Sequence, residues 1–272
     1  EAYERLKREI LRPNGMIVTT GPTGSGKTTT MYAILRLLNK PGVKIITLED
    51  PVEIKMEGVN QSQVDESHDY TFAKGLRSLL RQDPDICMVG EIRDLETAEI
   101  AIQSALTGHL MLSTIHTNSA SSAIPRFLSM GVKPFLLAPA LNSIIGQRLV
   151  RRICENCTEE LQLTPEQSAR VKEQLTNLPS TEKTKINLDD LHFYHGHGCD
   201  DCNNLGYRGR IGIYEVMIMN KETEQIILSS QISEYTLQEI AIKNGMVTMV
   251  QDGLLKALDK LTTVEEIFRV NE

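Results

Sequence analysis

A short segment near the start of the chain has the residue types and spacing of a phosphate-binding loop. It reads GPTGSGKT from Gly21 to Thr28 and matches G-x-x-x-x-G-K-[ST] in full. Glycines permit a tight turn whose amide N–H groups point at phosphate oxygens, and the following helix adds the positive end of its dipole. The pattern predicts that Lys27 reaches the β- and γ-phosphates of ATP and that Thr28 binds Mg²⁺ through its hydroxyl. The alternative is a glycine-rich turn without a ligand. The predicted nucleotide-binding set is Gly21, Pro22, Thr23, Gly24, Ser25, Gly26, Lys27, Thr28 and Thr29.

Acidic residues at the ends of two expected strands supply the rest of the chemistry. ATP hydrolysis needs a metal ligand and a group that orients the attacking water, and ligands of open parallel sheets bind at the carboxyl ends of strands. We assign Glu49 as the water-polarising base and Glu91 to the Mg²⁺ or water shell, although these two roles are interchangeable at this stage. Gly90 stands where many P-loop enzymes have Asp. Asp50 and Glu53 are equally consistent with solvated loop charges.

Two histidines flank the strand expected at 110–115. His116 follows its carboxyl end, where phosphates bind, so it is a candidate for hydrogen bonding to the γ-phosphate and a candidate catalytic residue. A structural role for His116 is equally open. His109 lies at the other end of that strand and is the weaker candidate.

Four of the five cysteines form two CxxC pairs, Cys154 with Cys157 and Cys199 with Cys202. Two such pairs can present four thiolates to one tetrahedral Zn²⁺ and leave no position for water, so the pattern predicts a structural zinc site. Disulfides or free thiols are the alternatives. Cys87 lies in an apolar run and is expected to be a buried core thiol.

Composition narrows the class of protein. The net charge is −7, aromatic residues make up 4% and Trp is absent, so we expect no nucleic-acid partner. The one compact basic cluster, Arg148, Arg151 and Arg152, is interpreted as a solvated helix end or a subunit contact. We find no apolar run long enough to cross a bilayer and no secretory signal. Because the chain starts at Glu1 without Met, we expect a fragment of a longer protein.

Short apolar runs alternate with segments of helical periodicity in the first half of the chain. This alternation predicts an α/β fold with a mainly parallel sheet covered on both faces. The expected strands are 16–18, 43–48, 86–89 and 110–115, and the expected helices lie around 28–38, 72–80 and 98–106.

The second half has a different character, which predicts further domains. Thr164 and Gln167 predict a capped helix, 210–219 reads as a strand, and Thr263 with Glu266 predicts a capping box for the last helix. We divide the chain into an ATPase core at 1–150, a zinc-binding module at 151–212, and a C-terminal strand with a helical subdomain at 213–272.

Together these motifs resemble the secretion-type ATPases of type II secretion and type IV pilus assembly, the GspE/PilB group. The resemblance extends over nearly the whole chain. It is carried by GPTGSGKT at 21–28, ITLEDPVE at 46–53, LRQDPDICMVGEIRD at 80–94, TGHLMLSTIHTNSA at 107–120, and the CxxC pairs followed by GYRGRIGIYEV at 206–216. In that family these are the Walker A loop, the Asp box, an atypical Walker B strand that ends in Gly-Glu, the His box and a zinc-binding insertion.

The resemblance implies a RecA-like P-loop NTPase domain with a tetracysteine zinc module and a C-terminal helical subdomain. Glu49 and Glu91 match the catalytic acids of the family, and His116 and His109 match its His box. Two further residues, Arg77 and Arg81, match arginines before Walker B, where they would contact phosphate or a subunit interface.

The family also implies partners. We expect a cytoplasmic homo-hexamer, peripheral at the inner membrane, that needs the N-terminal domain of the same full-length protein and acts on an inner-membrane platform protein. Pilus retraction ATPases resemble the first half of the chain but lack the tetracysteine module, so that module favours pilus assembly or type II secretion. The alternatives are a retraction ATPase, a RecA-like nucleic-acid motor and a regulatory nucleotide-binding module.

Overall fold

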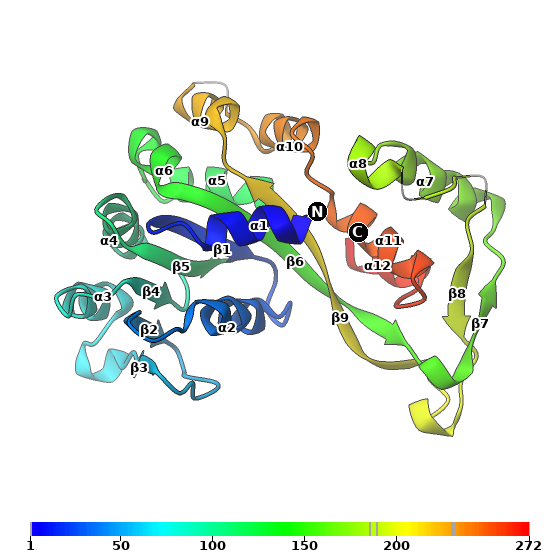
Figure 1. Cartoon of the computed structure of the whole chain (residues 1–272), viewed down its shortest axis with the longest axis horizontal. Coiled ribbons are helices and arrows are strands. Elements are labelled where there is room, and N and C mark those ends of the chain that lie inside the picture. Colours follow the sequence, from blue (N-terminus) through cyan, green and yellow to red (C-terminus); the bar gives the residue numbers. More distant parts are fainter. Residues whose placement is uncertain (1, 185, 189, 230–231, 272) are drawn as a thin grey trace.

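The computed structural model describes residues 2–184, 186–188, 190–229 and 232–271. Within these ranges a seven-stranded sheet forms the centre of the larger lobe, in the order β3-β2-β4-β5-β1-β6-β9 (Figure 1). Its strands are β1 (Gly15–Thr20), β2 (Ile45–Glu49), β3 (Val59–Gln63), β4 (Ile86–Val89), β5 (Leu110–Ile115), β6 (Leu141–Ile153) and β9 (Tyr207–Ile218). Neighbours from β3 to β6 pair in parallel, whereas β9 is antiparallel to β6.

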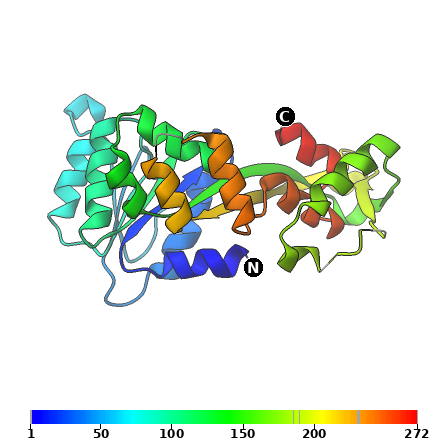
Figure 2. The same cartoon turned by 90° about the horizontal axis from the view of Figure 1, so that it is seen from above.

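Helices cover both faces of this sheet (Figure 2). On one face lie α1 (Ala2–Ile10) and α2 (Lys27–Leu38). On the other lie α3 (Phe72–Leu80), α4 (Leu95–Leu106), α5 (Ala120–Ser129), α6 (Pro134–Ala140), α9 (Lys221–Leu228) and α10 (Glu234–Lys243). The expected alternation of strands and helices is therefore confirmed. None of the helices in the described ranges combines the length and apolar character needed to cross a bilayer.

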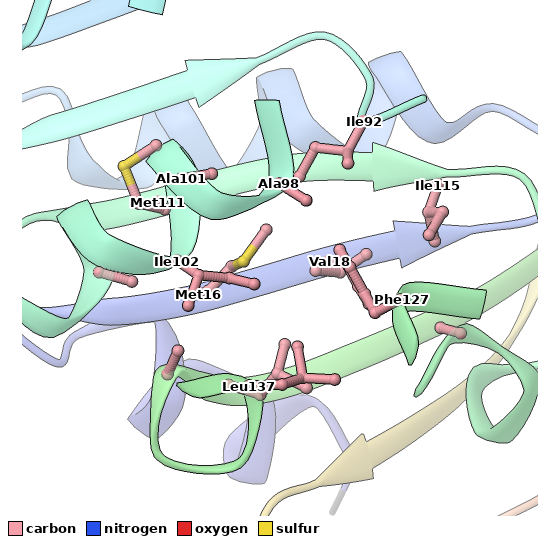
Figure 3. Close-up of a cluster of buried hydrophobic side chains, with 14 of the residues drawn as sticks. Met16, Val18, Ile92, Ala98, Ala101, Ile102, Met111, Ile115, Phe127 and Leu137 are labelled. Atoms are coloured by element: carbon pink, nitrogen blue, oxygen red, sulfur yellow. The ribbon is translucent and has the colours of Figure 1, made fainter. Parts of the chain in front are cut away.

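The strands are buried on both faces, which explains their continuous apolar runs. Along β1, Met16 and Val18 pack into the cluster under α4 and α5, and Ile17 between them packs into the cluster under α2. Figure 3 shows Phe127 of α5 in the first cluster, where it is fully buried. Burying each large side chain of this kind contributes about 1.5–3 kcal/mol. Cys87 on β4 also lies in this core, and burial raises the pKa of its thiol to about 12.

A smaller lobe is joined to the sheet by the long antiparallel ribbon of β6 and β9 (Figure 1). It contains β7 (Thr158–Leu161), β8 (Phe193–Gly196), α7 (Pro165–Thr176), α8 (Ser180–Lys183), α11 (Met249–Leu258) and α12 (Val264–Asn271). Its apolar core includes Val171, Leu175, Phe193, Leu254 and Ile267. Short 3₁₀ turns occur at η1 (Glu66–His68), η2 (Glu155–Cys157) and η3 (Asp200–Cys202).

The strand β6 was not predicted, and its basic residues were misinterpreted. Arg148, Arg151 and Arg152 lie on this strand, so their assignment to a helix end is wrong, while the alternative of a subunit contact stays a prediction. The first seven residues of β6 are buried, because β1 and β9 flank it on either side. Both β6 and β9 cross the boundaries expected at 150 and 212, and the division of the chain there stays a prediction.

Helix capping follows the sequence at one site and departs from it at another. Thr164 and Gln167 form the predicted reciprocal box at the start of α7. At α12, Thr263 Oγ1 accepts from the amide of Glu266 at 3.2 Å as expected. The Glu266 carboxylate does not complete a box, however, because it binds Arg151 and Arg269 instead. A buried carboxylate gains more from two guanidinium groups than from one amide.

Candidate nucleotide site and candidate metal centre

The predicted phosphate loop connects β1 to α2 at the carboxyl edge of the sheet. Gly24 and Gly26 have φ angles of +77° and +88°, in the left-handed region that suits glycine, so the loop closes tightly enough to converge its amides. Helix α2 begins at Lys27. Its N-cap residue is Gly26, which has no side chain that could accept hydrogen bonds from the first turn. The amides of that turn are consequently left available for an anion.

A cavity of about 370 Å³ opens above this loop, within the usual volume range of small-molecule sites. It brings together most of the loop with the acids and one histidine predicted from the sequence. The predicted residues on its wall are Thr23, Gly24, Gly26, Lys27, Thr28, Thr29, Glu49, Glu91 and His116. Gly21 and Pro22 border an adjoining cavity that His116 also lines, and Ser25 is buried behind the loop. Asp50 and Glu53, which were equally consistent with solvated charges, line the main cavity too.

The ammonium group of Lys27 lies over the loop. Its Nζ donates to the carbonyl oxygens of Gly21 at 2.9 Å and Pro22 at 3.1 Å. Partial burial lowers the pKa of Lys27, and the negative charge of Glu91 acts in the opposite direction. The charge is thus held close to the position that a phosphate would occupy.

Glu49 is fixed at the end of β2. It is only 2% exposed, and its carboxylate accepts from Thr47 Oγ1 at 2.5 Å and from Gln61 Nε2 at 3.2 Å. The hydroxyl of Tyr32 on α2 donates a third hydrogen bond. Burial and the interaction with Glu49 raise the pKa of Tyr32 to about 12, so this hydroxyl keeps its proton. A carboxylate has about four acceptor positions, which leaves room for one more donor such as water.

Glu91 lies beside His116, which is expected to contact a γ-phosphate. Its Oε2 is 3.3 Å from His116 Nε2, and its Oε1 pairs with Arg93. The preceding Gly90 is packed tightly: a Cβ there would lie 3.3 Å from the carbonyl oxygen of Leu48. The departure from Asp at this position therefore fits the close approach of β2 and β4.

The remaining candidates lie away from the cavity. His109 precedes β5 at the opposite edge of the sheet, where its Nδ1 is 3.2 Å from the carbonyl oxygen of Ser104. Arg77 forms a half-exposed ion pair with Glu96 at 2.6 Å, and Arg81 is the C-cap of α3. None of these three residues lines the cavity on this chain.

Among the cavity residues that were not predicted from the sequence, two come from far along the chain. Arg210 on β9 and Leu149 on β6 both line the cavity. They reach the site because β6 pairs with β1 and β9 pairs with β6, which brings residues far along the chain to the loop. Only a correct assignment of β6 could have pointed to them.

The four cysteines gather between the turns η2 and η3. Their Sγ atoms all lie within 4.8 Å of one another, with Cys154–Cys199 and Cys157–Cys202 at 3.8 Å and Cys199–Cys202 at 3.7 Å. Zn–S bonds of about 2.3 Å in a tetrahedron place sulfurs about 3.8 Å apart. The spacing thus fits one tetrahedral ion, and it is too long for disulfides.

Backbone amides support negative charge on this cluster. Those of Cys199 and Gly206 donate to Cys202 Sγ at 3.2 and 3.3 Å. Burial raises the pKa of Cys202, but these amides and the neighbouring thiols outweigh it and hold the value at about 6. Such N–H···S contacts orient metal-bound thiolates, so the donor set fits zinc.

Comparison with known proteins gives matches over almost the whole chain. Residues 1–269 match the family model described as Type II/IV secretion system protein. The Type IV pilus assembly ATPase PilB of Thermus thermophilus is 45% identical over 265 residues, which is 97% of this chain and 29% of that protein. The Type II secretion system ATPase E of Vibrio cholerae is 43% identical over 270 residues, covering 99% of this chain and 51% of that protein. The chain thus spans about half of one relative and less than a third of the other.

A solved structure has a similar arrangement. The pilus retraction motor PilT with bound ADP superposes with a TM-score of 0.68 at 28% identity, over 98% of this chain and 62% of that one. The similarity covers both lobes of the present structure.

Proposed function

This chain belongs to the type II/IV secretion system protein family, and we propose that it is the ATP-hydrolysing motor region of a machine that assembles a type IV pilus or drives type II secretion. The observation that carries the proposal is the meeting of the phosphate loop, Lys27 and Glu91 on one cavity. The substrate is ATP with Mg²⁺. Relatives that are 43–45% identical are named for both systems, so this similarity does not select between them.

Binding is assigned to the loop and the first turn of α2. The loop amides and the Lys27 ammonium offset the charge of a triphosphate, since both present N–H donors to the same space. Thr28 and Glu91 line the same cavity, where Thr28 supplies a hydroxyl oxygen and Glu91 supplies carboxylate oxygens. Oxygen ligands of this kind are those that Mg²⁺ prefers, so the residues fit the ion.

Hydrolysis is assigned to the two strand-end acids and His116. Water attacks the γ-phosphorus, the bond to the β-phosphate oxygen breaks, and ADP, phosphate and a proton are the products. Glu49, held by three donors, orients the water and takes up its proton. His116, next to Glu91, donates a hydrogen bond to the γ-phosphate. Glu91 is assigned to the shell of the Mg²⁺ ion or of the attacking water.

The oligomeric state, location and partners of the full-length protein are also part of the proposal. We place the chain in a homo-hexamer in the cytoplasm, peripheral at the inner membrane. There the N-terminal domain of the same protein completes the nucleotide site, and a membrane platform protein receives the movement. Arg77, Arg81 and His109 lie outside this chain's own cavity, a position that suits contacts with a neighbouring subunit. The cysteine cluster holds a structural Zn²⁺.

The Glu91→Gln variant tests the proposal. We expect ATP binding to persist within about threefold, while hydrolysis falls by about 100-fold or more because a carboxylate of the water or metal shell is lost. Pilus or secretion output should vanish with it. The matched control is Glu99→Gln, an exposed glutamate on α4. Output that survives without hydrolysis would instead identify a regulatory nucleotide-binding module.

The similarity to PilT keeps pilus retraction as a second candidate. Deleting the gene separates the two: loss of an assembly motor leaves cells without pili, and loss of a retraction motor leaves them with an excess. ATP hydrolysis stimulated by single-stranded DNA or RNA would point away from both, to a nucleic-acid motor.

A further inference from the structure

A buried carboxylate on β9 is hydrogen-bonded to the starts of two helices from different lobes. Glu215 is 4% exposed; its Oε1 accepts from the amide of Ala120 at 2.6 Å, and its Oε2 accepts from the amide of Met249 at 3.4 Å. Ala120 is the first residue of α5, and Met249 is the first residue of α11. Both helix dipoles therefore present their positive ends to one carboxylate.

The facing strand is shaped to let this carboxylate through. Glu215 pairs with Gly146 of β6, and a Cβ at that position would lie 2.8 Å from Glu215 Oε1 and 3.0 Å from the Ala120 amide nitrogen. Any side chain at 146 would push the carboxylate away from α5. Burial raises the pKa of Glu215, while the two backbone amides and the charge of Arg148, two residues along β6, act in the opposite direction. The Nε of Arg148 has no hydrogen-bond partner among the described residues.

The Ala120 end of this contact leads to the nucleotide cavity. Only the loop 116–119 separates α5 from β5, and His116 at its start lines the cavity. Thr117 is fixed to Thr20 of β1 by three hydrogen bonds, at 2.5, 2.9 and 3.0 Å. Because the loop is short and Thr117 is hydrogen-bonded to β1, a shift of the first residue of α5 is expected to move His116 as well.

The Met249 end leads to the smaller lobe. Helix α11 packs against α7 and α12, and Leu254 and Ala257 lie in the core of that lobe. One side chain therefore joins the loop that carries His116 to the helix around which the cysteine-bearing lobe is built.

We propose that Glu215 is a positioning residue for ATP hydrolysis, which holds the His116 loop in register with α11 and so links the nucleotide cavity to the smaller lobe. The inference rests on the proposed function. It predicts that a nucleotide-dependent shift of His116 is passed through the α5 start to Glu215, and from there to α11. None of the predicted site residues makes this connection.

Glu215→Gln tests the link while preserving volume. An amide has one acceptor oxygen, and its NH₂ group faces a backbone N–H, so one of the two helix starts must lose its partner. We expect kcat for ATP to fall roughly tenfold, the size of a lost charge-assisted hydrogen bond, with KM within about twofold. Glu99→Gln is the matched control. In a His116→Ala background Glu215→Gln should cause no further loss of kcat; additive losses would overturn the proposal.

Hydrogen exchange gives a readout independent of turnover. In the unsubstituted protein, a non-hydrolysable ATP analogue with Mg²⁺ should slow amide exchange in both 116–120 and 249–253. In Glu215→Gln the change should persist in the first segment and disappear in the second. Gly146→Ala, which displaces the carboxylate without altering it, should give the same pattern and decides the matter if Glu215→Gln does not fold.

Retention of the response at 249–253 in either variant would overturn the inference and leave the proposed function intact. Absence of hydrolysis in the unsubstituted protein would instead sink the proposed function, while the exchange experiment would still decide the link.

Discussion

The nucleotide cavity and the cysteine cluster hold their polar groups in opposite ways. The cavity lies on a sheet with an extensive apolar cluster on each face, so its loop and acids are placed by a fold that exists without a ligand. The cysteine cluster lies beyond the end of that sheet, in a lobe with a much smaller core. We therefore expect function and stability to be separable in the first region, whereas a metal held by the four cysteines would contribute directly to the folding of the second.

Removing metal should have the largest effect and should be confined to the smaller lobe. Apparent binding energies of structural zinc sites reach about 10–16 kcal/mol in small zinc domains. We expect a strong chelator, or Cys157→Ser, to abolish protection against hydrogen exchange around the cluster and in β7 and β8. ATP binding by the loop should survive. A lobe that stays protected after metal analysis shows no bound zinc would break the comparison.

Lys27→Ala should weaken ATP binding and leave the smaller lobe folded, the opposite of the effect of metal removal. Losing an ammonium group from a phosphate site costs about 1.5–3 kcal/mol, so ATP affinity should fall by about 10- to 100-fold. The melting temperature without nucleotide should fall by only a few degrees, about 2–4 °C per kcal/mol, since the Lys27 side chain contributes two hydrogen bonds to loop carbonyls but no core packing. Calorimetric titration and thermal unfolding measure the two quantities. Lys40→Ala, an exposed lysine after the same helix, is the control and should change neither.

Acidification should weaken the contacts that Glu266 of α12 makes with Arg151 of β6 and with Arg269. Burial alone would raise the pKa of Glu266, but hydrogen bonds from Arg269 and Arg151 outweigh it and hold the value at about 2, below the ordinary 4.5. The resulting stabilisation is present above about pH 4.5 and is lost as the pH falls towards 2; a shift of this size is worth up to about 3 kcal/mol. Glu266→Gln should therefore be less stable than the unsubstituted protein at pH 7, and the two should converge near pH 2. A difference in unfolding free energy that does not change with pH would contradict this.

Arg210→Ala should give the smallest effect. This exposed residue faces the nucleotide cavity from β9, and exposed charges contribute about 0.2–1 kcal/mol. We expect ATP affinity to fall by about two- to fivefold, with the lobe and its metal unchanged. A loss as large as that of Lys27→Ala would show that the cavity depends on β9 as much as on the loop.

Local signals explain which parts could be predicted. The phosphate loop has a specific motif, and β4 and β5 are short, largely apolar runs that lie where the sequence predicted strands. The strand β6 mixes apolar residues with Arg148 and Arg151, whose charges are balanced by partners distant in sequence, such as Glu266. Arg210 and Glu215 also act on residues that are distant in sequence. For that reason the sequence alone predicts neither the place of Arg210 at the cavity nor the contacts of Glu215 with two helices. The cysteine cluster could be predicted because metal ligands constrain the spacing of residues along the chain. The β6–β9 ribbon could not, because it forms by pairing of two strands that are far apart in sequence.

That ribbon has a mechanical consequence. Beyond Gly146, where β6 stops pairing with β1, eight residues of β9 (207–214) continue towards the cysteines for roughly 26 Å at about 3.3 Å each. A two-stranded antiparallel ribbon has a larger twist than a wide sheet. Because this ribbon joins the two lobes, a change in its twist would turn the smaller lobe, with its cysteine cluster, relative to the sheet.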